Sequence, residues 1–136
     1  MEVPPNLPVV TGVTPYINVV GASDASAFYQ RAFGAKELIR LPAQDGKRLM
    51  HCCLEINSGK LMMSDCFPEH GHNHEPSKSF TMHLQVDDVD AWWERAVAAG
   101  VEVVMPLQLM FWGDRYGIVR DPFQVQWSLA MTPKAS

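Results

Sequence analysis

The chain repeats itself once, with an offset of about 65 residues, and this repeat constrains the fold more than any other sequence feature. In each half, a strand-like run is followed by a helical pattern that ends at a glycine, Gly34 or Gly100. Aromatic pairs, Phe28-Tyr29 and Trp92-Trp93, lie at matching places in the two helical patterns. An internal repeat indicates a duplicated structural unit, so the two halves are predicted to share one fold.

Apolar residues recur at helical spacing in both halves, which predicts one amphipathic helix in each. The two stripes consist of Ala25, Phe28, Tyr29, Ala32 and Phe33, and of Val89, Trp92, Trp93, Ala96 and Val97. Ser23 or Asp24 is predicted to cap the first helix, because such side chains accept hydrogen bonds from free backbone N–H groups. Asp87 or Asp88 is predicted to cap the second helix in the same way.

Strand-like runs surround both helices and give each half the predicted order β-α-β-β-β. They lie near 15–20, 36–41, 48–56 and 60–65, and near 81–86, 101–105, 109–119 and 124–130. Two such modules predict an α+β fold with a curved eight-stranded sheet and a helix on the outer face of each half. The concave inner face of that sheet is the natural place for a ligand.

The 136 residues are predicted to form a single domain, with module one at about 13–66 and module two at about 80–130. A turn-rich linker at about 67–79 joins the modules. The linker contains a run of alternating histidines, His70, His72 and His74. Loose binding of a transition metal and a polar loop without such a role are both left open for this run.

Composition limits the partners and the cellular location of the chain. The 11 basic residues are scattered, the net charge is −4, and no basic stripe indicates nucleic-acid binding. No apolar run reaches the roughly 20 residues of a membrane span, and the N-terminal residues do not resemble a signal peptide. The three cysteines, Cys52, Cys53 and Cys66, make a poor disulfide framework. We therefore expect a cytoplasmic protein that binds neither nucleic acid nor membrane.

Three of the predicted strands alternate between apolar and polar residues, which places the two kinds on opposite faces. The apolar faces carry Met50, Cys52, Leu54 and Ile56; Met82, Leu84 and Val86; and Val125, Trp127 and Leu129. The polar faces carry His51, Cys53 and Glu55; Thr81, His83 and Gln85; and Gln124, Gln126 and Ser128. Solvated strands usually carry Lys, Glu and Thr, so this set favours a lined pocket over a simply solvated face.

Segments in both halves carry a resemblance to a known family. They are Thr14-Pro15-Tyr16, Phe28-Tyr29, 33–35, Met50-His51, Ser64-Asp65, Met105-Pro106-Leu107-Gln108, 111–117 and Asp121-Pro122-Phe123. Together these segments resemble PhnB-like proteins of the vicinal-oxygen-chelate superfamily, which includes glyoxalases, bleomycin-resistance proteins and extradiol dioxygenases. The resemblance implies the paired β-α-β-β-β fold, often in a homodimer, but no particular reaction, because the superfamily contains both enzymes and binding proteins.

Metal-dependent members of this superfamily usually supply one His or Glu from the first and last strand of each half. The matching positions here are Pro15, Met63 or Ser64, Thr81 and Ser128. None of these positions offers the imidazole or carboxylate that divalent ions need, so the resemblance implies no metal and no other cofactor.

A displaced site for a divalent transition metal is the alternative. His51, His83 and Glu55 would supply a 2-His-1-carboxylate set. His51 and Glu55 lie about 13 Å apart along one predicted strand, which disfavours a shared ion.

The chain also departs from the family at Gln124, where a glycine usually follows Asp-Pro-x. If the turn still needs a positive φ, glutamine costs about 1 kcal/mol there. Otherwise the hairpin has changed its geometry.

Two further groups of residues could carry a binding or catalytic role. Trp112, Arg115 and Tyr116 offer flat rings next to a guanidinium, which suits a planar or anionic ligand, although the rings would equally serve as core or dimer-interface anchors. Cys53 lies two residues from His51, close enough for thiolate activation, but no third group orients the pair.

The leading prediction is a metal-free binding protein of the glyoxalase/bleomycin-resistance type that sequesters a neutral or anionic small organic molecule. The alternative is a metal-dependent lyase, isomerase or dioxygenase with the displaced metal site. A third possibility is a dimerising domain whose pocket is filled by its own side chains. The predicted ligand-binding residues are His51, Cys53, Glu55, Thr81, His83, Gln85, Trp112, Arg115, Tyr116, Gln126 and Ser128.

Overall fold

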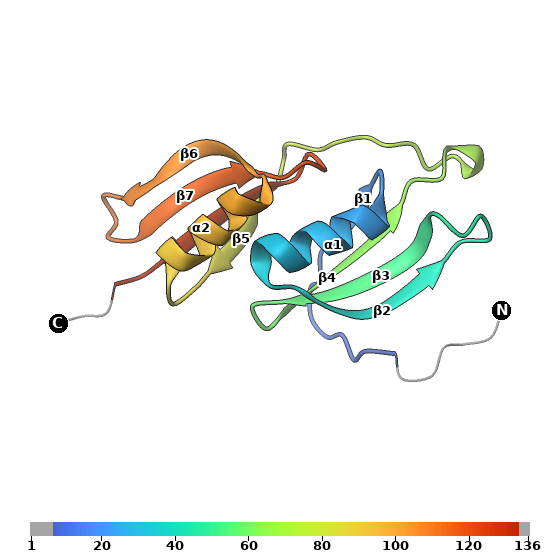
Figure 1. Ribbon diagram of the computed structural model, residues 1–136, viewed down its shortest axis with the longest axis horizontal. Helices are drawn as coiled ribbons and strands as arrows, with labels where there is room; N and C mark the ends of the chain where they lie inside the picture. The colour runs from blue at the N-terminus through green and yellow to red at the C-terminus, as the bar shows by residue number, and fades with distance from the viewer. Residues whose placement is uncertain (1–6, 134–136) are drawn as a thin grey trace. The chain divides into compact units, whose positions relative to one another are not determined.

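The computed structural model describes residues 7–133 as two units, each with one α-helix and four strands (Figure 1). Unit 1 ends at residue 74, except that residues 31–33 are grouped with unit 2. Its elements are β1 (Tyr16–Val19), α1 (Ala22–Phe33), β2 (Lys36–Pro42), β3 (Leu49–Ile56), β4 (Gly59–Asp65) and the 3-10 helix η1 (Pro68–His70). Unit 2 contains β5 (Met82–Gln85), α2 (Val89–Ala99), β6 (Glu102–Leu109), β7 (Arg115–Arg120) and β8 (Gln126–Met131). The predicted order β-α-β-β-β is confirmed in both halves.

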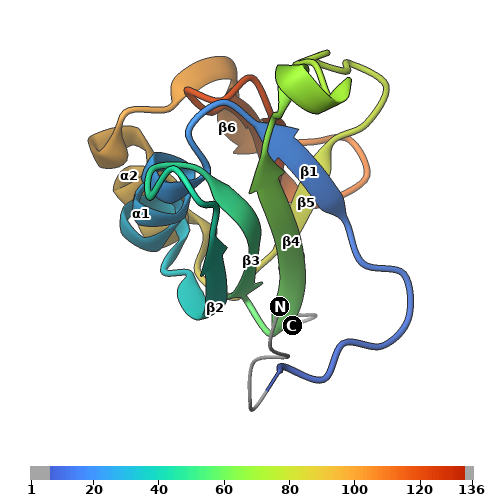
Figure 2. The ribbon, with the colours of Figure 1, turned by 90° about the vertical axis from the view of Figure 1, so that its right-hand side faces the viewer.

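The two units share one sheet topology. The strand order is β1-β4-β3-β2 in unit 1 (Figure 2) and β5-β8-β7-β6 in unit 2. In each unit the first and last strands pair in parallel, and the other neighbours pair antiparallel. The eight strands thus form two hydrogen-bonded sheets of four, one for each predicted module. No helix within residues 7–133 has the length and apolar character needed to cross a membrane.

The core of each unit lies between its helix and one face of its sheet. In unit 1, the buried Ser26 of α1 donates a hydrogen bond at 2.9 Å to Glu37 of β2, which places α1 over that strand. In unit 2, a Cβ built on Gly117 of β7 would lie 2.5 Å from the Trp93 ring of α2. Only glycine therefore allows α2 to approach β7 this closely.

The start of α1 differs from the prediction. Its N-cap is Gly21, and the carboxylate of Asp65 at the end of β4 accepts hydrogen bonds from the N–H groups of Gly21 and Ala22 at 2.8 and 3.1 Å. Ser23 and Asp24 lie within the first turn, so the prediction that one of them caps the helix was wrong. A carboxylate from a distant strand satisfies the free N–H groups instead.

The other predicted helix ends are confirmed. Asp88 is the N-cap of α2, and its side chain accepts a hydrogen bond from the Ala91 N–H at 3.2 Å. The left-handed glycines Gly34 and Gly100 end α1 and α2, with φ of 64° and 112°. Glycine adopts this conformation without the clash that a Cβ would cause.

Two details of the predicted strands were wrong. The run 109–119 is not one strand, because β6 ends at Leu109 and a turn at 110–114 precedes β7. Met50 was assigned to the apolar face but is 45% exposed. A register shift between β2 and β3 at Leu41 and Pro42 interrupts the alternation beside it, as a β-bulge does.

The turn between β7 and β8 keeps the backbone geometry that favours glycine, although Gln124 occupies it. Its φ is 67°, so the alternative of a changed hairpin was wrong. The buried carboxylate of Asp121 holds this turn by accepting hydrogen bonds from the N–H groups of Phe123 and Val125 and from Trp127 Nε1.

Candidate functional site

Polar side chains gather on the sheet face of unit 2 that points away from the buried core. Leu84 of β5 and Trp127 and Leu129 of β8 are buried, so their alternate neighbours point to the opposite face. His83 lies directly opposite Ser128 in the parallel pairing of β5 with β8. We call this surface the polar face of unit 2; it consists of Thr81, His83, Gln85, Tyr116, Gln126 and Ser128.

A chain of hydrogen bonds fixes the His83 imidazole on this face. Its Nδ1 lies 2.6 Å from Ser128 Oγ, and its Nε2 lies 2.8 Å from Gln85 Oε1. Gln85 Nε2 in turn donates to Thr132 Oγ1 at 2.8 Å. Because a carbonyl oxygen only accepts, this arrangement assigns the proton of neutral His83 to Nε2 and lets the Ser128 hydroxyl donate to Nδ1. His83 is exposed, whereas Ser128 is buried.

The rest of the face combines an amide–hydroxyl pair with aromatic rings. Gln126 Nε2 donates to Thr81 Oγ1 at 2.8 Å. The Tyr116 ring is stacked with the His83 ring at a centroid distance of 6.1 Å, and Trp112 meets Tyr116 edge-on at 5.5 Å. Trp112 is 48% exposed, so the ring is not a core anchor of unit 2. The structure thus brings seven predicted residues together in unit 2.

Arg115 does not join them. It precedes Tyr116 on β7 and therefore points to the opposite face, where its guanidinium pairs with Asp90 of α2 at 2.7 Å. This pair holds the pKa of the Asp90 carboxyl below its usual range. The idea that the guanidinium acts beside Trp112 and Tyr116 was wrong. Alternation alone separates Arg115 from its neighbour Tyr116, but no local pattern indicates the pairing with Asp90, which is 25 positions away.

The three predicted residues of unit 1 lie on β3 and have different surroundings. The Tyr16 hydroxyl lies 3.0 Å from His51 Nδ1, within hydrogen-bonding distance, and burial lowers the pKa of His51. Glu55 pairs with Lys60 at 3.3 Å. Cys53 is fully buried, and burial raises the pKa of its thiol, which disfavours the activated thiolate considered above.

The positions that the resemblance matches to metal ligands can be placed in the structure. Pro15 has no side-chain donor atom, and Ser64 Oγ accepts from Asn18 at 2.8 Å and donates to the Asp65 carbonyl at 3.1 Å. Thr81 and Ser128 carry only hydroxyls, which take part in the hydrogen bonds described above. Within residues 7–133, no three His, Cys, Asp or Glu side chains form a group able to hold a metal ion. Of the residues predicted for a displaced site, His51 contacts Tyr16, Glu55 pairs with Lys60, and His83 is held by Ser128 and Gln85.

Unit 1 contains a pocket of about 1010 Å³ that the sequence did not predict. It lies where the ends of β1, β3 and β4 meet the β2–β3 turn and the segment 67–72. We call it the Arg48 pocket, and its walls include Asn18, Asp45, Arg48, Met50, Phe67 and Glu69. Two histidines of the predicted linker, His70 and His72, also line it.

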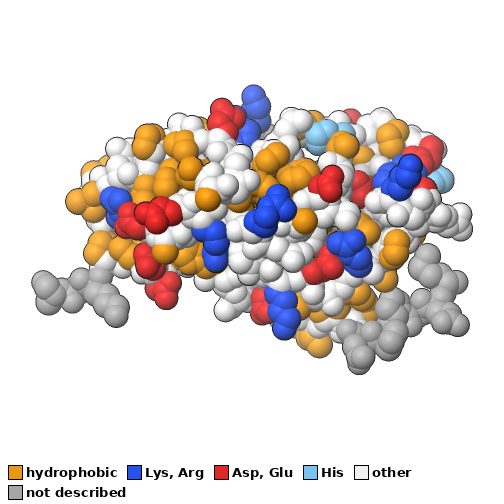
Figure 3. Space-filling view, in the orientation of Figure 1, with side chains coloured by type: hydrophobic (Ala, Val, Ile, Leu, Met, Phe, Trp, Pro, Cys, Tyr) orange, Lys and Arg blue, Asp and Glu red, His pale blue; other side chains and the backbone are white. Residues whose placement is uncertain are grey.

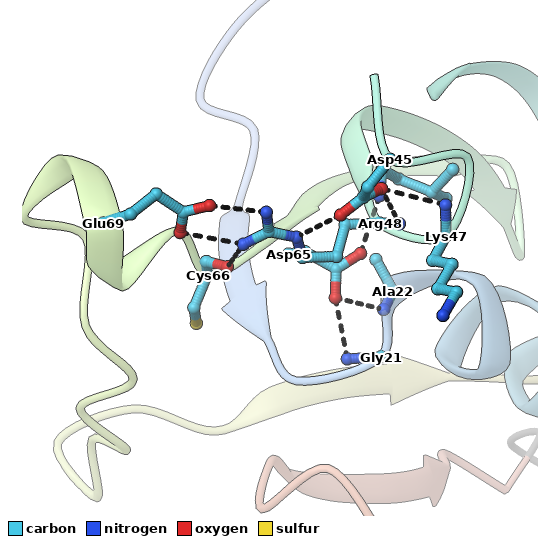
Figure 4. A network of polar contacts seen from close by, with 9 residues as sticks. Gly21, Ala22, Asp45, Lys47, Arg48, Asp65, Cys66 and Glu69 are labelled. Atoms are coloured by element: carbon cyan, nitrogen blue, oxygen red, sulfur yellow. Dashed lines mark hydrogen bonds and ion pairs between the residues drawn. The ribbon is translucent and has the colours of Figure 1, made fainter. Parts of the chain in front are cut away.

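Arg48 ties two walls of this pocket together (Figure 4). Its Nε donates to Asp45 at 2.7 Å, and both terminal nitrogens donate to the carboxylate of Glu69. The guanidinium also lies 4.4 Å from the centre of the Phe67 ring. The sequence signal for this network was weak, because Glu69 is 21 positions from Arg48 and lies in a segment interpreted only as a linker.

The chain consists of two β-α-β-β-β units. One has a polar sheet face and the other has a pocket, and these features are typical of small α+β proteins that bind ligands. A family model described as the Glyoxalase/Bleomycin resistance protein/Dioxygenase superfamily matches residues 10–129. The Mycobacterium bovis protein Mb0911c is 44% identical over 123 residues, which cover 86% of this chain and 80% of that protein. The chain belongs to this superfamily.

Solved structures share the fold. PA1353 from Pseudomonas aeruginosa is 29% identical, has a TM-score of 0.75 and matches 91% of this chain and 99% of its own. A PhnB protein from Bacillus cereus is 17% identical, has a TM-score of 0.73 and matches 90% of this chain and 100% of its own. The PhnB-like resemblance is thus confirmed at the level of the fold.

Proposed function

We propose that this chain is a small-molecule-binding protein of the glyoxalase/bleomycin-resistance type and that the polar face of unit 2 carries its ligand. The exposed His83, held between Ser128 and Gln85, is the observation that supports this proposal most directly. A side chain that is fixed by hydrogen bonds and still reaches solvent loses little conformational freedom when a ligand binds.

The composition of the face favours a neutral ligand with a planar, hydrogen-bonding part. Amide, hydroxyl and imidazole groups supply both donors and acceptors, and Tyr116 and Trp112 supply ring surfaces. Arg115 would have favoured an anion, but it points to the α2 side and is neutralised by Asp90. A neutral aromatic amide therefore matches the face better than its acid or its amine.

We further propose that binding does not use the four-ligand metal site of the metal-dependent relatives. The chemistry of the donors supports this proposal, since hydroxyls, a thioether and a proline replace imidazoles and carboxylates at the matching positions.

Alanine variants of His83 and Gln126 test the site. Benzamide is the probe, and its binding is followed through tryptophan fluorescence and by two-dimensional amide NMR. Each substitution is expected to weaken binding by about 1–2 kcal/mol, roughly 5- to 30-fold. Gln126→Ala removes a hydrogen-bonding partner of the ligand, and His83→Ala removes a ring surface and the group that holds the Gln85 amide in place. His70→Ala is the matched histidine control, since His70 lines the Arg48 pocket, and it should leave benzamide affinity unchanged.

The melting temperatures of the same variants separate a binding role from a structural one. If His83→Ala and Gln126→Ala lower the melting temperature by many degrees while benzamide affinity stays the same, these side chains are structural. If benzamide shifts no resonance of the polar face, the site is wrongly placed.

A further inference from the structure

The Arg48 pocket is large enough for an organic molecule and belongs to unit 1 alone. Its volume of about 1010 Å³ corresponds to the upper end of the range found for small-molecule sites. Met50, which is 45% exposed, Pro42 and Phe67 supply apolar surface, and the amides of Asn18 and Gln44 supply hydrogen-bonding groups. This mixture is typical of sites that orient a ligand with a polar end and an apolar body.

The charges around the pocket leave an excess of negative charge. Asp45, Asp65 and Glu69 line it together with a single cation, Arg48, so the excess is two charges when His70 and His72 are neutral. Hydrogen bonds from backbone N–H groups and from Arg48 lower the pKa of Asp45 to about 2, and hydrogen bonds from Arg48 lower that of Glu69 to about 2. Both carboxylates therefore stay ionised at neutral pH. Lys47 is not among the lining residues.

The hydrogen bonds of Arg48 make an anionic ligand unfavourable. Its Nε is used by Asp45, its Nη1 and Nη2 by Glu69, and its Nη1 also lies 3.5 Å from the Cys66 carbonyl oxygen. An anion would have to displace Glu69 and would still face the other carboxylates. A cation meets carboxylate oxygens that keep free lone pairs, because each oxygen of an ionised carboxylate accepts more than one hydrogen bond.

We propose that the Arg48 pocket is a second binding site, for a small organic cation such as a primary amine on an aromatic or aliphatic body. Because Arg48 lies between Asp45 and Glu69, the ammonium group contacts the carboxylate lone pairs that Arg48 leaves free, and the apolar body lies against Met50 and Phe67. This site is independent of the polar face of unit 2, which favours a neutral ligand.

Three probes of nearly equal shape and different charge test the proposal: benzylammonium, benzamide and benzoate. Binding to isotope-labelled protein is followed by NMR at pH 7. Benzylammonium should shift resonances of residues 42–50 and 64–72 and bind at least tenfold more tightly in this pocket than benzoate. Its affinity should fall as salt concentration rises, because the attraction is between charges near the surface.

Two substitutions and one matched control separate this pocket from general surface charge. Glu69→Gln and Asp45→Asn should each weaken benzylammonium binding at least fivefold, and Glu69→Gln should strengthen benzoate binding because Arg48 loses a paired carboxylate. Glu94→Gln makes the same change of net charge on α2 in unit 2 and should leave both affinities unchanged. Unfolding would weaken the binding of both probes. A higher affinity for benzoate together with a lower affinity for benzylammonium therefore cannot result from unfolding.

The readouts also keep this proposal apart from the proposed function. Benzylammonium in the Arg48 pocket is recognised by shifted resonances of residues 42–50 and 64–72, whereas benzamide on the polar face of unit 2 is recognised by shifts at His83, Gln85 and Gln126. The proposal is overturned if benzoate binds there as tightly as benzylammonium, if Glu94→Gln weakens binding as much as Glu69→Gln, or if only resonances of unit 2 shift. Failure of benzamide to bind bears on the polar face of unit 2 alone.

Discussion

Replacing Gln124 with glycine should stabilise the protein. Gln124 has a φ of 67°, and its exposed side chain has no core contact to lose. A residue with a Cβ costs about 1–2 kcal/mol in the left-handed region. Glycine removes this cost but makes the unfolded chain more flexible, which costs about 0.5–1 kcal/mol. The expected net gain is about 0.5–1 kcal/mol, or about 2–5 °C in melting temperature for a chain of this length.

Urea unfolding monitored by circular dichroism, together with thermal melting, measures this change. Gln124→Ala is the matched control, because alanine removes the long side chain but keeps the Cβ that causes the strain. It should lie within about 0.5 kcal/mol of the unchanged protein, as surface substitutions usually do. If Gln124→Gly gives no gain, or if Gln124→Ala gives the same gain, relief of backbone strain is not the source and the reasoning fails.

Two further predictions concern packing and acid. Gly117→Ala should destabilise the protein by about 1–3 kcal/mol, because its Cβ would overlap the Trp93 ring and lie 3.0 Å from the Leu107 backbone; unchanged urea unfolding would contradict this. Because the pKa values of Asp45 and Glu69 are lowered to about 2, the stability that these carboxylates add is present above about pH 4.5 and lost as the pH falls towards 2. Between pH 6 and 2, the melting temperature of Asp45→Asn should therefore fall less steeply with pH than that of the unchanged protein. Equal slopes would count against a stabilising role for these ion pairs.

The fold could be predicted because each element carries its own periodic signal. Helical spacing around Phe28-Tyr29 and Trp92-Trp93 and the repeat of the whole pattern identified both modules before any contact was known. The start of α1 could not be predicted in this way. Asp65, which satisfies its N–H groups, is more than 40 positions from Gly21, and capping rules consider only neighbouring residues.

The same holds for the candidate sites: contacts between alternating residues of neighbouring strands could be predicted, whereas contacts between distant segments could not. Alternation placed His83, Gln85 and Ser128 on one face, and hydrogen bonds join them there. The pairing of Arg115 with Asp90 joins residues 25 positions apart, and no local pattern indicates it. The pocket around Arg48 depends on η1 folding back beside the β2–β3 turn, and no pattern within either segment indicates that meeting.

The parallel strand pairs impose an order of events while the chain is being synthesised. Tyr16 of β1 lies opposite Met62 of β4, and Met82 of β5 lies opposite Trp127 of β8. The hairpin of β3 and β4 needs only nearby residues, whereas each parallel pair must close a loop of more than 40 residues, which is slower. Unit 1 can complete its sheet as soon as β4 has left the ribosome, while unit 2 is still being made. β5 has no strand partner until β8, the last of the described strands, emerges; a nascent chain stalled before that point exposes the β5 edge to other nascent chains.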